Sequence, residues 1–216
     1  MKLKTVVAFI FVLSLTIISF AQKKDAGSLV GSWESVNVEN ARGLMMKLNP
    51  DKTFILQTVL TADYSYSIKG DRMINKLLNA HTGKMIIDTS IIKINKDTLT
   101  SIFRRNGKDE TTVMVKMPGK ENSGKGILGN YTWKYPNGHT AFSKFTKDGK
   151  WLFRLPIETE KGKYSLNKNT ISFHYANADT VVDNQKFWFK KNLLILTNEK
   201  TNKQNLYRRV DFFLDK

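Results

Sequence analysis

The stretches Gly31-Ser32-Trp33 and Gly129-Asn130-Tyr131-Thr132-Trp133 decide the fold of this chain, because each of them opens a similar run of sequence. Each opening is followed by a turn with an aromatic residue after it, and then by a hairpin signal. The matching positions in the two runs are Gly31 and Gly129, Asp51 and Asp148, and Tyr66 and Tyr164. Their offsets of 98, 97 and 98 residues are nearly constant. A near-constant offset indicates an internal repeat.

Within each run, polar and apolar residues alternate with the period of two that is typical of strands. The segments 54–60, 93–103 and 187–196 are rich in β-branched and aromatic residues. Turn dipeptides recur between such segments at Asn49-Pro50, Gly70-Asp71, Asn106-Gly107, Asn137-Gly138 and Asp148-Gly149. The pattern predicts an all-β fold with about eight short strands per run. Only residues 73–80 do not alternate, and we expect a short helical turn there.

Residues 1–21 have the composition of an export signal. Lys2 and Lys4 precede an almost wholly apolar run from Val6 to Phe20, and Ser19-Phe20-Ala21 is a small-x-small cleavage site. The alternative is a retained membrane anchor, but the apolar run is short for a membrane span. We therefore expect cleavage before Gln22, a periplasmic or extracellular location, and no membrane span after cleavage.

The segment 118–127 contains three glycines and one proline and almost no apolar residue, which predicts a linker. The expected organisation is a signal peptide at 1–21, a first unit at 22–117, the linker at 118–127 and a second unit at 128–216. The chain has no cysteine, so an exported form must be held by its apolar cores alone.

The net charge of the chain is +16, and removal of Lys2 and Lys4 with the signal leaves +14. Such an excess attracts polyanions. The lysines are scattered singly through turns and strand edges, which is typical of a solvated surface and of edge-strand protection. Export argues against nucleic acid as a partner, and an anionic envelope surface stays open as one.

The opening Leu29-Val30-Gly31-Ser32-Trp33 resembles the first strand of lipocalin-like proteins, which carries Gly-x-Trp, and residues 49–54 resemble the second hairpin of small exported bacterial members. The resemblance covers both units in outline and implies two tandem antiparallel up-and-down β-barrels. The second unit departs from the pattern, because Tyr131 stands at the tryptophan position and Trp133 follows two residues later.

In the lipocalin family the opening tryptophan plugs one barrel end and is covered by an arginine from the last strand. The resemblance therefore implies structural plug roles for Trp33, Tyr131, Trp133, Arg208 and Arg209. We expect Arg208 or Arg209 to lie over Tyr131 or Trp133. The last strand of the first unit, 112–116, has no arginine.

The residues of common catalytic and metal sites are absent or scattered. His81, His139 and His174 lie far apart, whereas a zinc site needs three or four convergent ligands. There is no nucleophile elbow, phosphate loop or dinucleotide fingerprint. Glu158 and Glu160 share a strand face and fit an exposed edge better than a proton relay. The sequence thus predicts no catalytic, cofactor-binding or metal-binding residue and disfavours an enzyme.

Two functions are consistent with these features. The first is an exported binding protein for a small apolar or amphipathic ligand, which the Gly-x-Trp openings and the β-meander favour. The alternative is a structural or interaction module of the cell envelope that contacts glycan, anionic lipid or another protein, which the charge and the many aromatic residues favour.

Overall fold

The structure is a computed structural model, and it describes residues 29–78, 82–105, 107–119, 126–177 and 182–214. In that part of the chain every named element is a strand, so the all-β prediction is confirmed. The 14 strands are β1 (Gly31–Ser35), β2 (Arg42–Leu48), β3 (Thr53–Lys69), β4 (Arg72–Leu78), β5 (Met85–Asn95), β6 (Thr98–Arg105), β7 (Lys108–Lys116), β8 (Gly129–Lys134), β9 (Thr140–Phe145), β10 (Lys150–Asn167), β11 (Thr170–Tyr175), β12 (Val182–Lys190), β13 (Leu193–Asn198) and β14 (Gln204–Val210).

The strands form one antiparallel sheet in which each strand pairs with its neighbours in sequence, and β14 pairs with β1 to close a ring. The two longest strands, β3 with 17 residues and β10 with 18, also pair with each other. This extra pairing divides the strand order into two smaller closed series. One series is β1, β2, β3, β10, β11, β12, β13 and β14, and the other runs from β3 to β10.

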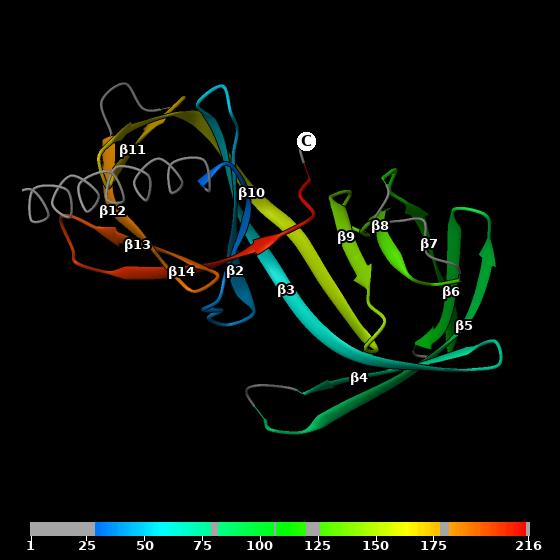
Figure 1. Cartoon of the computed structure of the whole chain (residues 1–216). Helices are drawn as coiled ribbons and strands as arrows, with labels where there is room; N and C mark the ends of the chain where they lie inside the picture. Colours follow the sequence, from blue (N-terminus) through cyan, green and yellow to red (C-terminus); the bar gives the residue numbers. More distant parts are fainter. Residues whose placement is uncertain (1–28, 79–81, 106, 120–125, 178–181, 215–216) are drawn as a thin grey trace, which may run out of the picture. The chain divides into compact units, whose positions relative to one another are not determined.

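Two compact units correspond to these two series. Unit 1 comprises residues up to Asn37, Met45–Leu56 and Glu160–Phe213. Unit 2 comprises Val38–Leu44, Gln57–Thr159 and the residues from Leu214. In Figure 1, unit 1 therefore combines the blue strand β1 and most of β2 with strands β11 to β14, which are coloured from dark yellow to red, and unit 2 holds the green strands.

These units do not follow the domain limits expected from the sequence. The expected boundary at 118–127 would assign one compact unit to each half of the chain, whereas each observed unit takes strands from both halves. The division falls instead inside β2, β3 and β10, each of which contributes one part to each unit. Residues 1–21 and most of the expected linker lie outside the described residues.

Matched turns recur at the offset of the sequence repeat. Lys52, with a φ of 67°, corresponds to Gly149, with a φ of 73°, and each lies in a turn that leads into a long strand. Further on, Gly70 at 63° corresponds to Lys168 at 52°, 98 residues later. Left-handed backbone is uncommon outside glycine, so its recurrence at equivalent positions supports the repeat.

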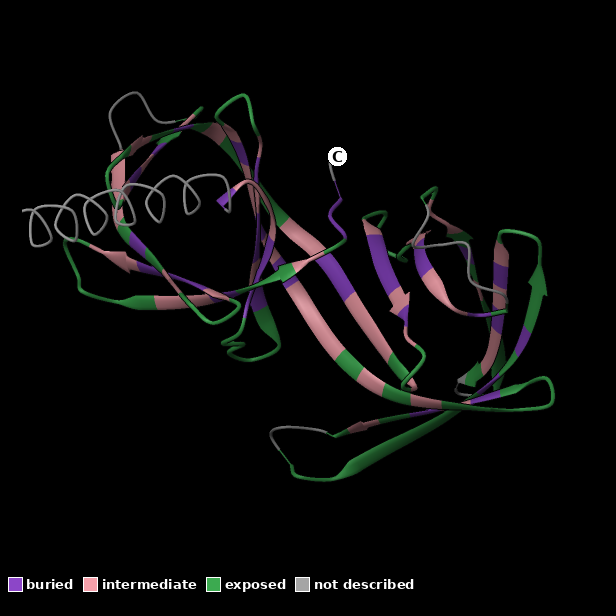
Figure 2. Ribbon diagram, viewed as in Figure 1, coloured by how far each residue is buried: buried purple, intermediate pink, exposed green. Residues whose placement is uncertain are grey.

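Alternation along the strands places one face of each series on an apolar core (Figure 2). Phe54 in unit 1 makes edge-to-face contacts with Phe173 and Tyr175, at ring-centroid distances of 5.0 and 5.3 Å. The core of unit 2 consists of Met73, Ile92, Leu99, Met114, Ile127, Tyr131 and Phe145. We call the strand face that carries these core residues the inner face of each unit.

Residues 72–78 form β4, so the predicted helical turn at 73–80 is wrong over its described part. The alternation of polar and apolar residues fails there because the inner face of the strand carries a polar residue and the outer face carries apolar ones. The inner face of β4 carries the polar Asn75 beside Met73, while its outer face carries the apolar Ile74 and Leu78.

Candidate functional site

Trp33 is a buried residue of β1 in unit 1. Its indole Nε1–H donates to the carbonyl oxygen of Leu29 at 2.8 Å, as expected for a buried opening tryptophan. The guanidinium carbon of Arg209 lies 4.6 Å from the ring centroid. Gly31 makes this approach possible, because a Cβ there would stand 2.7 Å from Arg209 Nη1.

The arginine of this arrangement comes from the second half of the chain and covers the tryptophan of the first. Arg209 thus lies over Trp33 instead of Tyr131 or Trp133, because β14 pairs with β1. Arg208 points to the other face and donates to Glu34 Oε2 at 2.7 Å. In unit 2 the strand that pairs with Tyr131 is β7, which has no arginine, and Lys116 Nζ lies 5.6 Å from the centroid of Tyr131.

Trp133 packs differently from Trp33. It is half-buried, and its Nε1–H donates to Ser143 Oγ at 3.1 Å. Its ring meets Tyr135 and Phe153 in tilted contacts, at centroid distances of 5.5 and 5.9 Å. Trp133 therefore belongs to an aromatic group on unit 2, with no arginine over it in the described contacts.

The inner face of unit 2 carries a second aromatic group built around Trp151. Tyr64 stacks on Trp151 at 4.5 Å with an interplanar angle of 21°, and Phe145 stacks at 5.5 Å with an angle of 17°. Tyr66 packs edge-on against Phe145, and its hydroxyl donates to the carbonyl oxygen of Thr146. We call Tyr64, Tyr66, Phe145 and Trp151 the aromatic wall.

Three buried polar atoms on this inner face have no hydrogen-bond partner: Asn75 Oδ1, Ser90 Oγ and Trp151 Nε1. Asn75 is 6% exposed and Ser90 is 4% exposed. Asn75 is the register partner of Tyr66, and Ser90 is the register partner of Met73, two residues from Asn75 on the same face. The open hydrogen-bonding groups therefore share a face with the aromatic wall.

These three polar atoms lack the hydrogen bonds that buried polar groups normally make. A buried polar group without a partner costs about 1–3 kcal/mol, so native structures satisfy nearly all of them. Asn75 Oδ1 is an acceptor, Trp151 Nε1–H is a donor, and the Ser90 hydroxyl is both. A molecule with one apolar ring or chain and a few neutral polar groups has the chemistry that matches these atoms and the aromatic wall.

Unit 1 has a polar cluster too, which is paired in part: Gln185 Oε1 and Thr197 Oγ1 are buried there without a hydrogen-bond partner, whereas Asp183 is well partnered. Asp183 accepts hydrogen bonds from Gln185 Nε2 at 2.5 Å and from Asn198 Nδ2 at 2.7 Å. Burial is the main cause that raises the pKa of Tyr175 to about 12, with smaller contributions from Asp183 and Glu160. Burial also raises the pKa of Tyr207 strongly, followed by effects of Tyr175 and Asp183. The cluster holds neutral tyrosines around a partnered carboxylate, which suits a structural role.

The histidines and glutamates considered in the sequence analysis do not form a second site among the described residues. Among the described residues no three His, Asp or Glu side chains are placed to hold a metal ion, and His81 lies outside that part. Glu158 and Glu160 are exposed. No helix in the described ranges is long and apolar enough to cross a membrane.

Comparisons with known proteins identify no relative. No family model matches the chain, and neither a curated protein nor a solved structure matches it.

Sequence reasoning did not find Asn75, Ser90 or the aromatic wall. The signal that was available is the break in alternation at 73–80, where an asparagine occupies a position that the strand pattern assigns to the core. Polar residues at core positions of a strand mark either an error in the pattern or a site.

Proposed function

We propose that this chain is a non-enzymatic binding protein that holds one small amphipathic molecule on the inner face of unit 2. The observation that carries the proposal is the set of unpartnered atoms Asn75 Oδ1, Ser90 Oγ and Trp151 Nε1 beside the aromatic wall. The apolar part of the ligand stacks on Tyr64 and Trp151, and its polar part binds the three atoms.

Unit 1 has the structural role in this proposal. Trp33 is bonded to Leu29 and covered by Arg209. The carboxylate of Asp183 already has two donors. Unit 2 is the better candidate for a ligand, because its unpartnered atoms share a face with the aromatic wall.

We also propose that the fold is lipocalin-like and that the protein is exported. The support for the fold is the closed series of eight antiparallel strands in each unit and the Gly-x-Trp opening under an arginine. The interior of an up-and-down ring of eight strands is either filled by side chains or holds one small ligand. The support for export is the composition of residues 1–21.

Titration with the neutral fluorescent probe N-phenyl-1-naphthylamine tests the function. We expect one probe per chain, with an affinity that depends weakly on salt, because burial and neutral hydrogen bonds are little screened. Tyr64→Leu removes a stacked ring worth about 0.5–1.5 kcal/mol and lowers the affinity by up to about tenfold. Phe189→Leu, which alters a half-buried ring 6.0 Å from Trp33 in unit 1, is the matched control.

The proposal fails if the probe does not bind, or if Phe189→Leu weakens binding as much as Tyr64→Leu does. Native mass spectrometry of the purified protein is the complementary experiment. A co-purified small molecule that is lost in Tyr64→Leu and kept in Phe189→Leu would identify the natural ligand.

A further inference from the structure

An exposed apolar hairpin end is the feature of unit 2 that ligand binding does not explain. Leu78, Met85, Ile86 and Ile87 are 60%, 53%, 47% and 62% exposed, although each is a large apolar residue. We call these four residues the β4–β5 tip. Leu78 and Met85 are register partners and Ile87 lies on the same outer face, so these three form one surface, whereas Ile86 lies on the opposite face. Figure 2 shows β4 and β5 largely exposed along this end.

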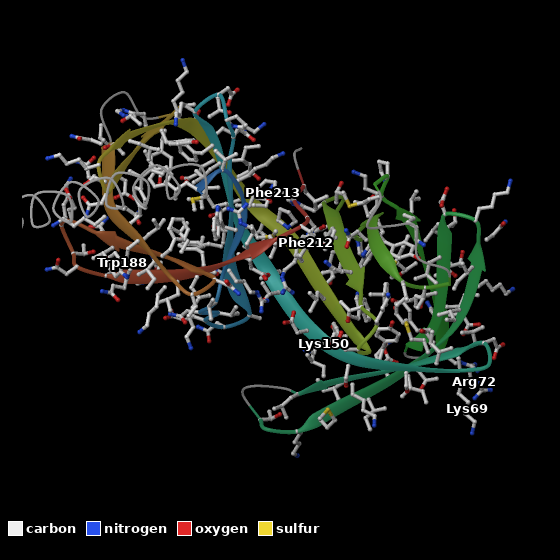
Figure 3. The ribbon with its side chains drawn as sticks, in the orientation of Figure 1. Lys69, Arg72, Lys150, Trp188, Phe212 and Phe213 are labelled. Carbon is white, nitrogen blue, oxygen red and sulfur yellow. The ribbon has the colours of Figure 1, made fainter. Side chains whose placement is uncertain are left out.

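Two lysines lie beside the tip: Lys76 is the register partner of Ile87, and Lys84 directly precedes Met85. The charged residues of β4, β5 and the described part of their connection are Arg72, Lys76, Lys84, Asp88 and Lys93. Asp88, the one acid among them, accepts a hydrogen bond from the backbone N–H of Thr89. Lys69 pairs with Arg72 at the far end of β4, and both side chains extend away from the sheet (Figure 3).

From this arrangement we propose that the β4–β5 tip docks unit 2 onto an anionic lipid surface. An apolar strip flanked by basic residues is the pattern of proteins that lie at the membrane interface. The apolar side chains enter the acyl boundary, and Lys76 and Lys84 remain at the headgroups, where their long stems allow the charge to reach the phosphates.

Charge decides between this surface and a second copy of the chain. Two copies that met through the tip would bring Lys76 and Lys84 of each copy together, and like charges that face one another oppose association. An anionic bilayer offers the complementary charge and an apolar interior at once. The inference goes beyond the proposed ligand site, because the outer residues of the tip, such as Met85 and Ile87, point away from the inner face that carries Asn75 and Ser90.

Vesicle co-sedimentation tests the docking. We expect the full chain to bind vesicles of phosphatidylglycerol and phosphatidylcholine, to bind pure phosphatidylcholine weakly, and to release as salt rises. The double variant Met85→Asn/Ile87→Asn should lower binding to the mixed vesicles by at least tenfold. Lys76→Gln/Lys84→Gln should lower it by about fivefold per lysine and flatten the salt dependence.

The controls separate docking from general effects. Val36→Asn replaces a residue of unit 1 that is 44% exposed, and Lys161→Gln/Lys163→Gln removes two exposed charges from unit 1. Both control variants should bind vesicles like the parent. In Ile87→Trp, tryptophan emission should shift to the blue when mixed vesicles are added, which gives a readout that needs no loss of binding.

Equal binding by the tip variants and the parent would overturn the proposal, as would equal losses in the unit 1 controls. So would an absence of vesicle binding together with a dimer in analytical ultracentrifugation that Ile87→Asn dissociates, since that result assigns the tip to a second copy. Probe titration is done without vesicles, so failure of the ligand proposal and failure of docking are separate outcomes.

Discussion

Replacement of Ser90 by alanine tests the ligand site through stability as well as binding. Ser90 Oγ is buried on the inner face of unit 2 without a partner, so the folded protein bears the cost of its desolvation. That cost is about 1–3 kcal/mol for a neutral group. Ser90→Ala removes the hydroxyl and only one heavy atom. We therefore expect the ligand-free protein to become about 1 kcal/mol more stable and to melt about 2–4 °C higher.

The same substitution should weaken ligand binding, because the hydroxyl is one of the groups that the ligand completes. A neutral hydrogen bond contributes about 0.5–1.5 kcal/mol, so the probe affinity should fall by up to about tenfold. Gain of stability and loss of affinity in one variant is the signature of a group that is kept for binding.

Ser143→Ala is the matched control, because Ser143 is also buried in unit 2 but accepts the hydrogen bond of Trp133 Nε1. This variant should lose about 1 kcal/mol or more, since it leaves the indole N–H unpaired. Thermal and urea unfolding of both ligand-free variants shows whether each substitution raises or lowers the stability. If Ser90→Ala loses stability as Ser143→Ala does, Ser90 has a partner in solution and the argument for the site is refuted.

Four further predictions follow from the two units. Trp33→Ala should cost about 3–5 kcal/mol in urea unfolding, and a melting point within a degree or two of the parent would show that the residue is not a core plug. Gly162→Ala should cost about 3 kcal/mol or more, because its Cβ would meet the His174 carbonyl oxygen at 2.0 Å and Phe54 at 2.7 Å; normal stability would contradict the packing of β10 in unit 1. Burial raises the pKa of Tyr131 and Tyr175 to about 12 from the ordinary 10.0, so their contribution to stability is complete below pH 10 and is lost as pH rises toward 12; a flat stability curve over that range would oppose it. Proteolysis within 118–127 should leave two fragments that co-elute in size-exclusion chromatography, because each unit uses strands from both, and fragments that separate while folded would contradict the observed units.

Local sequence was sufficient for the strands and for several turns. Alternation and turn dipeptides locate most strands, and the Gly-x-Trp opening correctly indicates a buried Trp33 with a bonded indole N–H. The left-handed turn at Lys52 and its counterpart at Gly149 lie where the repeat places them. These features depend on residues that are close in sequence.

Strand partners were not predictable in the same way. The two runs of sequence are alike, so β1 has two similar candidate closing strands, β7 and β14, and the arginines of β14 are the local feature that distinguishes them. The structure pairs Trp33 with Arg209 and Lys116 with Tyr131. Contacts between the two long strands and their turns accompany that pairing. The Tyr164 N–H donates to the carbonyl oxygen of Lys52 in unit 1, and the Tyr66 N–H donates to the carbonyl oxygen of Gly149 in unit 2. The unpartnered polar atoms of the site could not be predicted for a related reason, because the burial of Asn75 and Ser90 depends on strands that are distant in the sequence.

The most direct test of the proposed ligand site is the indole N–H region of a nitrogen–proton correlation spectrum, recorded during titration with N-phenyl-1-naphthylamine or the co-purified molecule. The chain has four tryptophans, so each indole signal can be assigned by single Trp→Phe variants. Trp151 Nε1 has no partner, whereas Trp33 donates to Leu29. The account predicts that the Trp151 signal moves on ligand addition while the Trp33 signal stays in place. A ligand that moves the Trp33 signal and leaves Trp151 unchanged would contradict it.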